Sequence, residues 1–262
     1  MKNLLILGCG WLGEELARDF KTKGWQVWVT TRSEEKYHRF LNDGISAIIH
    51  DYDHQERLDL PVEVHFDVIL NSIPASQKNS VDEIQTRFNR VFNSLSAISY
   101  DQHIFLSSIG VYPNLTGIYE ESYSDERLMS PTIRVAELTM ITLPYTSIFR
   151  LGGLFGKNRI FAKYFQDKIV EIGDQLANFV HLEDIIEIFD QFINNKNTTG
   201  YYNIVCPEHP QKKEVILASA QKYIFSYPQG FKPQNSFQKL VSSNKIIELL
   251  NYTFKYSSPI DF

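Results

Sequence analysis

A chain of 262 residues with 43% hydrophobic residues is long enough to bury a substantial core, in one large or two small domains. Its formal net charge of −5 argues against a nucleic-acid-binding surface, and scattered lysines and arginines are expected on solvated faces. The histidines and the two cysteines lack the paired spacing of metal ligands, so no metal site is expected.

No apolar run approaches the ~18 residues of a membrane span, and the N-terminus enters a predicted strand too quickly for a cleavable signal peptide. Cys9 lies inside a glycine-rich turn, where a disulfide would crowd a ligand, so a reducing compartment is expected. These features predict a cytoplasmic protein without a membrane partner.

The N-terminal segment is the most informative part of the chain. The apolar run Leu4–Leu7 leads into the turn Gly8–Gly13, whose glycines follow a GxGxxG pattern, and a helix-forming run comes next. The first glycine permits a tight turn, the second lets the backbone approach a pyrophosphate, and the third lets the helix pack closely on the strand. The free N–H groups of the helix N-terminus would then bind the anion. The predicted coenzyme contacts in this turn are Gly8, Gly10, Trp11, Leu12 and Gly13.

The end of the second predicted strand indicates which dinucleotide binds. A carboxylate there would bind the ribose hydroxyls of NAD and repel a 2′-phosphate, but Thr31, Arg32 and Ser33 precede the first acid, Glu34. A guanidinium and neighbouring hydroxyls suit the phosphate of NADP. We therefore predict NADP, with NAD as the alternative if Arg32 is merely an exposed residue at a strand end.

Apolar strands alternate with amphipathic helices through the first 155 residues. Strands are predicted at 3–8, 25–31, 46–49, 67–72, 102–107 and 145–151, and helices at 12–23, 33–43, 80–99 and 131–142. This alternation predicts an α/β protein, a Rossmann-type doubly wound parallel sheet with helices on both faces. Residues 1–155 would form the dinucleotide-binding domain.

The pattern is less regular in residues 156–262, which are predicted to form a smaller C-terminal substrate lobe with some elements returning to the sheet. Helices are predicted there at 160–169, 182–194, 211–222 and 243–250. A lobe at the carboxyl ends of the strands would form a substrate crevice.

Several segments follow one another in a familiar order. They are the glycine turn, His50–Asp53, Asp67–Pro74, Ile104–Tyr112, Ile148–Gly156, Asn178–Asp184 and Gly200–Val205. Through them the chain resembles the extended or atypical short-chain dehydrogenase/reductase superfamily, in its NAD-dependent epimerase/dehydratase-like group, over about residues 1–205. The resemblance implies that Asp51 lies beside the adenine ring. It also implies coenzyme contacts from Ser72, Ile73 and Pro74.

The same resemblance implies hydride transfer to or from the nicotinamide, with a tyrosine that passes the proton, a lysine that lowers the pKa of its phenol, and a serine that orients the substrate oxygen. Ser108, four residues before Tyr112, matches the serine, although its hydroxyl could instead bond the backbone at a strand end. Aligning Glu137 with the acid that follows the usual YxxxK pair places Met129 and Ile133 at the catalytic positions. Neither side chain can transfer a proton.

Other residues remain candidates for the missing roles. A shift of one residue places Arg134 at the lysine position, where it could hold the ribose, but it places Ser130, too weak an acid, at the tyrosine position. The tyrosines that flank the expected crevice are Tyr112, Tyr119 and Tyr123, and any of them either donates a proton or packs. His181 is either an acid or a structural hydrogen-bonding residue.

The sequence therefore predicts an NADP(H)-binding, oxidoreductase-like protein that acts by hydride transfer on a small carbonyl or sugar-nucleotide-like substrate. One alternative is a non-catalytic NADP(H)-binding sensor or scaffold, and another is a nucleotide-sugar epimerase or dehydratase, which would need the missing phenol. A homodimer through the helices at 80–99 and 131–142 is compatible with the sequence. The substrate, the reaction direction and the oligomeric state are not encoded in any recognisable motif.

Overall fold

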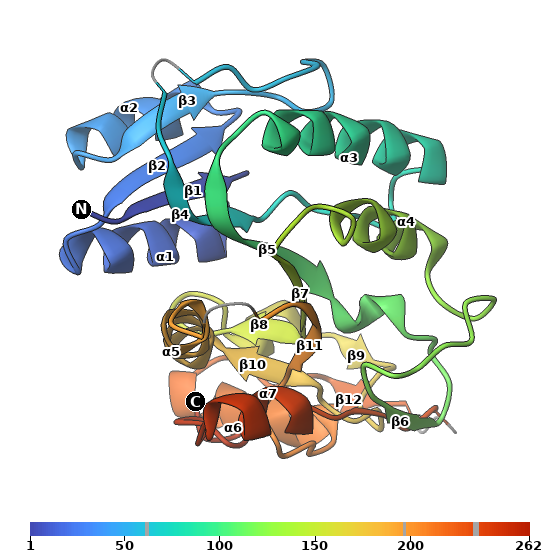
Figure 1. Cartoon of the computed structure of the whole chain (residues 1–262). Helices are drawn as coiled ribbons and strands as arrows, with labels where there is room; N and C mark the ends of the chain where they lie inside the picture. The colour runs from blue at the N-terminus through green and yellow to red at the C-terminus, as the bar shows by residue number, and fades with distance from the viewer. Residues whose placement is uncertain (61–62, 196–197, 233–235) are drawn as a thin grey trace. The chain divides into compact units, whose positions relative to one another are not determined.

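The computed structural model describes residues 1–60, 63–195, 198–232 and 236–262. The strands of its main sheet are β1 (Asn3–Leu7), β2 (Gln26–Thr31), β3 (Ser46–Ile49), β4 (Phe66–Asn71), β5 (Tyr100–Ser108), β7 (Thr146–Leu151) and β11 (Gly200–Ile204). They are arranged in the order β11-β7-β5-β4-β1-β2-β3 (Figure 1). The pairs β1/β2, β1/β4, β2/β3 and β4/β5 are parallel. This is the doubly wound order in which the sheet reverses direction beside the first strand, and it confirms the predicted α/β Rossmann-type fold.

The chain forms two compact units, each assembled from several segments. Unit 1 contains residues 1–111, 129–149 and 193–201, and unit 2 contains residues 112–128, 150–192 and 202–262. Both units therefore take residues from either side of position 155. No helix in the described ranges combines the length and the apolar character needed to cross a bilayer.

The helices of unit 1 cover the sheet because strand side chains alternate between its faces. Leu5 and Leu7 belong to a buried cluster with side chains of α3 (Val81–Ser96) and α4 (Pro131–Met140), whereas Ile6 lies against Gly13 of α1 (Trp11–Thr22). The N-terminus of α3 is fixed by a capping box, in which Ser80 and Glu83 bond each other's backbone. Helix α2 (Glu34–Asn42) lies beside α1, since Lys36 and Arg39 both pair with Glu14.

Unit 2 is built from short elements. It has three parallel two-stranded pairs, β6 (Gly117–Tyr119) with β13 (Lys239–Val241), β8 (Gly153–Phe155) with β10 (Phe179–His181), and β9 (Ile169–Val170) with β12 (Gly230–Phe231). Its helices are α5 (Leu182–Ile193, whose last residue belongs to unit 1), α6 (Lys212–Tyr223) and α7 (Asn244–Leu250).

The helix predicted at 160–169 is wrong. Only Phe161–Tyr164 form a helical turn, of 3₁₀ type. Asp167 adopts a left-handed backbone conformation with φ of 56°, which ends any continuation of the helix, and Ile169 then enters β9. The short strands of unit 2 escaped prediction because two or three residues are too few to show an alternating pattern.

One buried histidine should make stability depend on pH. His103 on β5 is fully buried, and its Nδ1 lies 2.9 Å from Oγ1 of Thr146. Burial lowers the pKa of His103 from 6.5 to about 3. Below pH 6.5 the unfolded chain therefore binds a proton that the folded chain does not, so stability is full above this pH and is lost as the pH falls towards 3.

We expect the free energy of unfolding, measured by urea denaturation, to fall by on the order of 1 kcal/mol per pH unit through this histidine between pH 6 and pH 4. His103→Gln keeps a hydrogen-bonding side chain but cannot titrate, so it should flatten the slope. The exposed His38, changed to glutamine, is the control. An identical slope in His103→Gln and the parent would contradict this assignment.

Candidate functional site

A cavity of about 670 Å³ opens in unit 1 where four neighbouring strands end. The turn after β1, the residues after β2, the loop after β3 and the loop after β4 all contribute to its walls. It therefore lies at the carboxyl ends of the strands, beside the β1/β4 pair where the strand order reverses, which is the usual ligand position in such sheets. Its lining residues are Gly8, Cys9, Gly10, Thr31, Arg32, Ser33, Lys36, His50, Asp51, Tyr52, Asp53, Ser72, Ile73, Pro74, Asn79 and Arg87.

The glycine turn forms one wall of the cavity. Gly8 has a left-handed φ of 70°, and its N–H donates to Oγ1 of Thr30 at 2.8 Å. A Cβ atom at Gly8 would lie 2.8 Å from Cδ1 of Ile73, so a side chain here would have to displace the Ile73 side chain as well as adopt the left-handed backbone. Gly13 is also restricted, because a Cβ there would meet Ile6 at 3.2 Å and Cys9 at 3.3 Å.

Gly10 differs from both. A Cβ atom at Gly10 would meet only the carbonyl oxygen of Gly8, at 3.8 Å, so the fold itself does not require glycine here. Gly10 is the N-cap of α1, and no side chain bonds the backbone at this cap. A bare helix N-terminus beside a glycine is the arrangement that binds a pyrophosphate. The protein's residues therefore fit a dinucleotide.

The residues after β2 place positive charge in the same cavity. The side chain of Arg32 is 67% exposed, and its Nη1 lies 3.3 Å from Asp53 and 3.8 Å from Asp51. Such exposed ion pairs contribute little, so the guanidinium is free to turn towards a ligand. The Thr31 and Ser33 hydroxyls accept backbone N–H groups at 3.2 Å, Ser33 as the N-cap of α2, and each retains a proton to donate.

Lys36 is a second cation in the cavity. It was not among the residues predicted from the sequence. It lies in the first turn of α2, four residues after Arg32, and its Nζ lies 2.6 Å from Oε1 of Glu14 and 3.5 Å from the carbonyl oxygen of Cys9. The spacing of four residues from Arg32 was the one sequence signal for Lys36. The first turn of a helix that follows β2 lies near the carboxyl end of β2, where Arg32 also lies.

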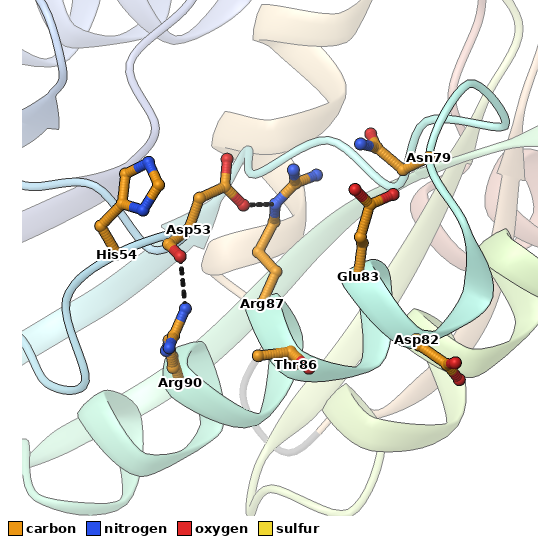
Figure 2. Close-up of a pocket in the computed structure, with 8 residues that line it drawn as sticks. All are labelled: Asp53, His54, Asn79, Asp82, Glu83, Thr86, Arg87 and Arg90. Carbon is orange, nitrogen blue, oxygen red and sulfur yellow. Dashed lines mark hydrogen bonds and ion pairs between the residues drawn. The ribbon is translucent and has the colours of Figure 1, made fainter.

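Arg87 of α3 ties two walls of the cavity together. Its Nε donates to Oδ1 of Asp53 at 2.6 Å, and its Nη1 donates to the carbonyl oxygen of Pro74 at 3.0 Å. The hydrogen bond from Arg87 lowers the pKa of Asp53. Figure 2 shows this pair within an adjoining cavity of about 500 Å³, where Arg90 also holds the backbone of Asp53. Arg87 is therefore a positioning residue for the loops after β3 and β4.

Most of the predicted coenzyme residues line the cavity, including Asp51 and the loop Ser72–Pro74. The other predicted residues of the turn, Trp11, Leu12 and Gly13, belong to α1 and are not among the described lining residues. The lining residues that the sequence did not single out are Cys9, Lys36, His50, Tyr52, Asp53, Asn79 and Arg87. Burial raises the pKa of the Cys9 thiol to about 12, so Cys9 contributes a neutral wall.

Ser108 ends β5 in unit 1 with an exposed side chain, and its Oγ accepts the N–H of Gly110 at 3.0 Å. Gln77 donates from Nε2 to the carbonyl oxygen of Gly110 at 3.1 Å and to Oγ of Ser130 at 3.2 Å. Hydroxyl and amide groups thus gather at this turn. They can orient a carbonyl oxygen, but none is an acid of useful strength.

The positions aligned with the usual tyrosine and lysine are apolar and buried. Met129 is 5% exposed and Ile133 is 4% exposed, and Cδ1 of Ile133 packs against Gly110. Arg134 follows on α4 with its side chain half-buried. Neither Met129 nor Ile133 has a side-chain proton to transfer.

Tyr112 belongs to unit 2, where its hydroxyl is enclosed. The ring is 2% exposed, the hydroxyl accepts Nη1 of Arg150 at 2.8 Å, and acceptors on Asn203 and Glu120 lie at 2.9 and 3.0 Å. Burial raises the pKa of Tyr112. This network favours the packing interpretation over proton donation. The rings of Tyr119 and Tyr123 lie 5.4 and 6.0 Å from that of Tyr112 and 5.2 Å from each other, between centroids.

His181, also in unit 2, has a structural environment. Its ring centroid lies 3.8 Å from that of Tyr256 and 4.6 Å from that of Phe262, and Nδ1 accepts the N–H of Glu183 at 3.2 Å. Burial lowers the pKa of His181 to about 4, so the ring is neutral at pH 7. The contacts favour the hydrogen-bonding interpretation over an acid role.

Comparison with known proteins finds a family model that matches part of the chain, a similar protein and similar solved structures. Residues 4–133 match the NAD dependent epimerase/dehydratase family. Protein YeeZ of Escherichia coli (strain K12) is 26% identical over 269 residues, which cover 99% of this chain and 98% of YeeZ.

Two solved structures illustrate the structural similarity. Human epimerase family protein SDR39U1 (isoform 2), determined with NADPH, has a TM-score of 0.73 at 15% identity, covering 98% of this chain and 96% of the other. The dTDP-glucose 4,6-dehydratase of Bacillus anthracis str. Ames, determined in complex with NAD, has a TM-score of 0.75 at 11% identity, covering 99% and 94%. The fold is thus shared by proteins seen with either dinucleotide.

Proposed function

We propose that this chain, whose residues 4–133 match the NAD dependent epimerase/dehydratase family, binds NADP(H) and acts as an oxidoreductase on a small-molecule carbonyl, either a simple compound or one resembling a sugar nucleotide. The observation that carries the proposal is the composition of the 670 Å³ cavity. A bare helix N-terminus at Gly10 and the cations Arg32 and Lys36 line one continuous space.

The coenzyme preference follows from the charges of that space. Arg32 and the hydroxyls of Thr31 and Ser33 stand where an NAD-specific site would carry a carboxylate, and Lys36 adds a second positive charge. These groups suit the extra phosphate of NADP. The similarity to a human protein studied with NADPH supports this choice, while the similarity to a dehydratase studied with NAD keeps NAD as the comparison for the test.

When bound, the coenzyme supplies or accepts a hydride at its nicotinamide. The chain contributes orientation, because the exposed Ser108 hydroxyl can donate a hydrogen bond to a carbonyl oxygen while its own geometry is held by Gly110. Gln77 keeps Gly110 and Ser130 in place. With Met129 and Ile133 at the acid positions, neither of these side chains can supply the proton that completes a carbonyl reduction.

A non-catalytic NADP(H)-binding sensor is the second candidate. The buried apolar side chains of Met129 and Ile133, together with the enclosed hydroxyl of Tyr112, favour it, since a sensor needs no proton donor. A sugar-nucleotide epimerase or dehydratase fits less well, because its cycle depends on the phenol that this chain lacks at the family position.

Turnover tests the two candidates. NADPH oxidation in the presence of a carbonyl panel, followed by loss of nicotinamide absorbance, should be detectable in the parent and should fall by about 100-fold in Ser108→Ala, as when one positioned donor to a developing oxyanion is lost. NADPH affinity should stay within about twofold, because Ser108 is outside the residues that line the cavity.

Ser96→Ala removes an exposed hydroxyl at the end of α3 and serves as the matched control. Tight NADPH binding without turnover across the panel would select the sensor. Absence of binding to both NADPH and NADH would overturn the proposal as a whole.

A further inference from the structure

Arg87 lies in the wall between two neighbouring cavities of unit 1. It lines both the coenzyme cavity of about 670 Å³ and the adjoining cavity of about 500 Å³. Figure 2 shows its side chain extending from α3 towards the loop that carries Asp53. Only 11% of this side chain is exposed. A nearly buried cation thus borders the space proposed for the coenzyme.

Two hydrogen bonds fix the orientation of the Arg87 guanidinium. Its Nε donates to Oδ1 of Asp53 at 2.6 Å, and its Nη1 donates to the carbonyl oxygen of Pro74 at 3.0 Å. Because the N–H groups of a guanidinium lie in its plane, partners on two different loops determine how that plane is tilted. These bonds use the edge of the group and not its flat faces. A flat ligand would therefore stack on a surface that is already held in place before it binds.

The position of Arg87 relative to Arg32 indicates which part of the coenzyme it meets. Asp53 lies between them, since its Oδ2 lies 3.3 Å from Nη1 of Arg32 and its Oδ1 accepts Nε of Arg87. The proposed function, on which this inference rests, assigns the 2′-phosphate of NADP to Arg32. The 2′-phosphate and the adenine base are attached to adjacent carbons of one ribose. The base therefore lies beside this pair of arginines.

The surroundings of Arg87 suit a flat and largely apolar ring. Ile73 and Pro74 contribute apolar side chains to the same cavity, and Pro74 also orients Arg87 through its carbonyl oxygen. A guanidinium stacks well on an aromatic face because it is planar, cationic and weakly hydrated. Asp53 already balances the charge of Arg87. A neutral base is consequently a better partner for this guanidinium than a second anion.

Arg90, one turn further along α3, differs from Arg87 in one respect. Its Nε donates to Oε1 of Glu56 at 2.9 Å, and its Nη1 donates to the carbonyl oxygen of Asp53. It lines the adjoining cavity together with Arg87, but it is not among the described lining residues of the coenzyme cavity. Both arginines therefore hold the Asp53 loop, and of the two Arg87 also borders the coenzyme cavity.

We propose that Arg87 is a specificity-determining residue that stacks its guanidinium on the adenine base of the bound coenzyme. The base is common to NADPH and NADH, so this contact strengthens the binding of both dinucleotides equally. In this it differs from Arg32, whose contribution depends on the 2′-phosphate of NADPH. The contact also selects against nicotinamide mononucleotide, which has no adenine.

Calorimetric titrations of the full-length protein with NADPH and with NADH test the contact. Arg87→Gln should weaken the binding of both by about tenfold, as expected for a largely desolvated cation stacked on a ring, and should leave the ratio of the two affinities unchanged. Arg87→Lys keeps a positive charge that can pair with Asp53 but has no flat surface, so it should weaken both by a similar factor. Adenosine 2′,5′-bisphosphate contains the base but not the nicotinamide, and Arg87→Gln should weaken its binding by the same factor.

Arg90→Gln is the matched control. It makes the same change of charge on the same helix and removes a hydrogen bond to the Asp53 loop, but it removes no group from the described wall of the coenzyme cavity. The affinities for NADPH and NADH should stay within about twofold of those of the parent, because an exposed ion pair such as that with Glu56 contributes little. Circular dichroism checks that each variant is folded.

Four results would each overturn the contact. They are unchanged binding in Arg87→Gln, a loss confined to NADPH, parental affinity in Arg87→Lys, and an equal loss in Arg90→Gln. The second would make Arg87 a phosphate ligand, and the last would show that it only positions the Asp53 loop. The proposed function would survive all four, because in each of them the parent binds the coenzyme. A parent protein that binds neither dinucleotide would instead overturn the proposed function, and this inference with it.

Discussion

Gly10→Val is expected to weaken NADPH binding by at least about 100-fold, while the protein remains folded. The glycine turn brings the backbone close to the pyrophosphate, and a valine side chain would fill the space in which the phosphates approach the N-terminus of α1. Loss of two hydrogen bonds to a charged group accounts for a change of this size.

The folded state should tolerate the substitution. Gly10 has φ of −92°, which any residue adopts, and a Cβ atom there meets only the Gly8 carbonyl oxygen at 3.8 Å. Circular dichroism and the melting temperature should therefore remain close to those of the parent. Calorimetric titration with NADPH measures the loss.

Valine substitutions at two further glycines distinguish a loss of NADPH binding from a loss of folding. Gly8→Val should lower the melting temperature sharply, since Gly8 has φ of 70° and its Cβ would lie 2.8 Å from Ile73. Gly230→Val places the same side chain in open space in unit 2 and should change neither property. If Gly10→Val bound NADPH as tightly as the parent, the turn would not be the pyrophosphate site.

The sequence predicts those parts of the site whose residues are close together in the chain. Leu4–Leu7 and the turn after it are consecutive residues, so the strand, the glycines and the helix start could be located without tertiary information. Thr31 ends the next strand, Arg32 and Ser33 follow it directly, and all three are positioned by the same parallel sheet. Asp51 and the loop Ser72–Pro74 required the family resemblance, because a loop sequence alone carries no periodic signal.

The remaining residues depend on contacts between distant segments. Arg87 contacts Asp53 across 34 positions of the chain, and nothing in a helical heptad indicates which exposed arginine will turn towards a loop. The role of Tyr112 was equally hidden, because Arg150 and Asn203, 38 and 91 positions away, enclose its hydroxyl. The sequence could indicate that a tyrosine and a lysine are missing at the expected positions of the helix. It could not indicate which other side chains already make hydrogen bonds within the fold.

The parent protein should bind NADPH more tightly than NADH, and Arg32→Glu should reverse this preference. The new carboxylate would lie near Asp51 and Asp53, which now pair with Arg32 at 3.8 and 3.3 Å. Three carboxylates would repel a 2′-phosphate, and one of them could accept hydrogen bonds from the ribose hydroxyls of NADH. We expect NADPH affinity to fall by about 10- to 100-fold, the range for losing a charged partner and gaining a like charge.

Parallel titrations with NADPH and NADH measure the coenzyme preference. Three further variants test whether this preference arises from Arg32 in the cavity. Arg57→Glu makes the same charge change at an exposed position of unit 1 outside the cavity, so it should leave the ratio of affinities unchanged. Lys36→Gln should lower NADPH affinity less than Arg32→Glu, because Glu14 already neutralises much of that charge at 2.6 Å. Combining Lys36→Gln with Arg32→Glu should add little, since both act on one phosphate. Equal affinities of the parent for the two dinucleotides would contradict the assignment of Arg32 to the 2′-phosphate.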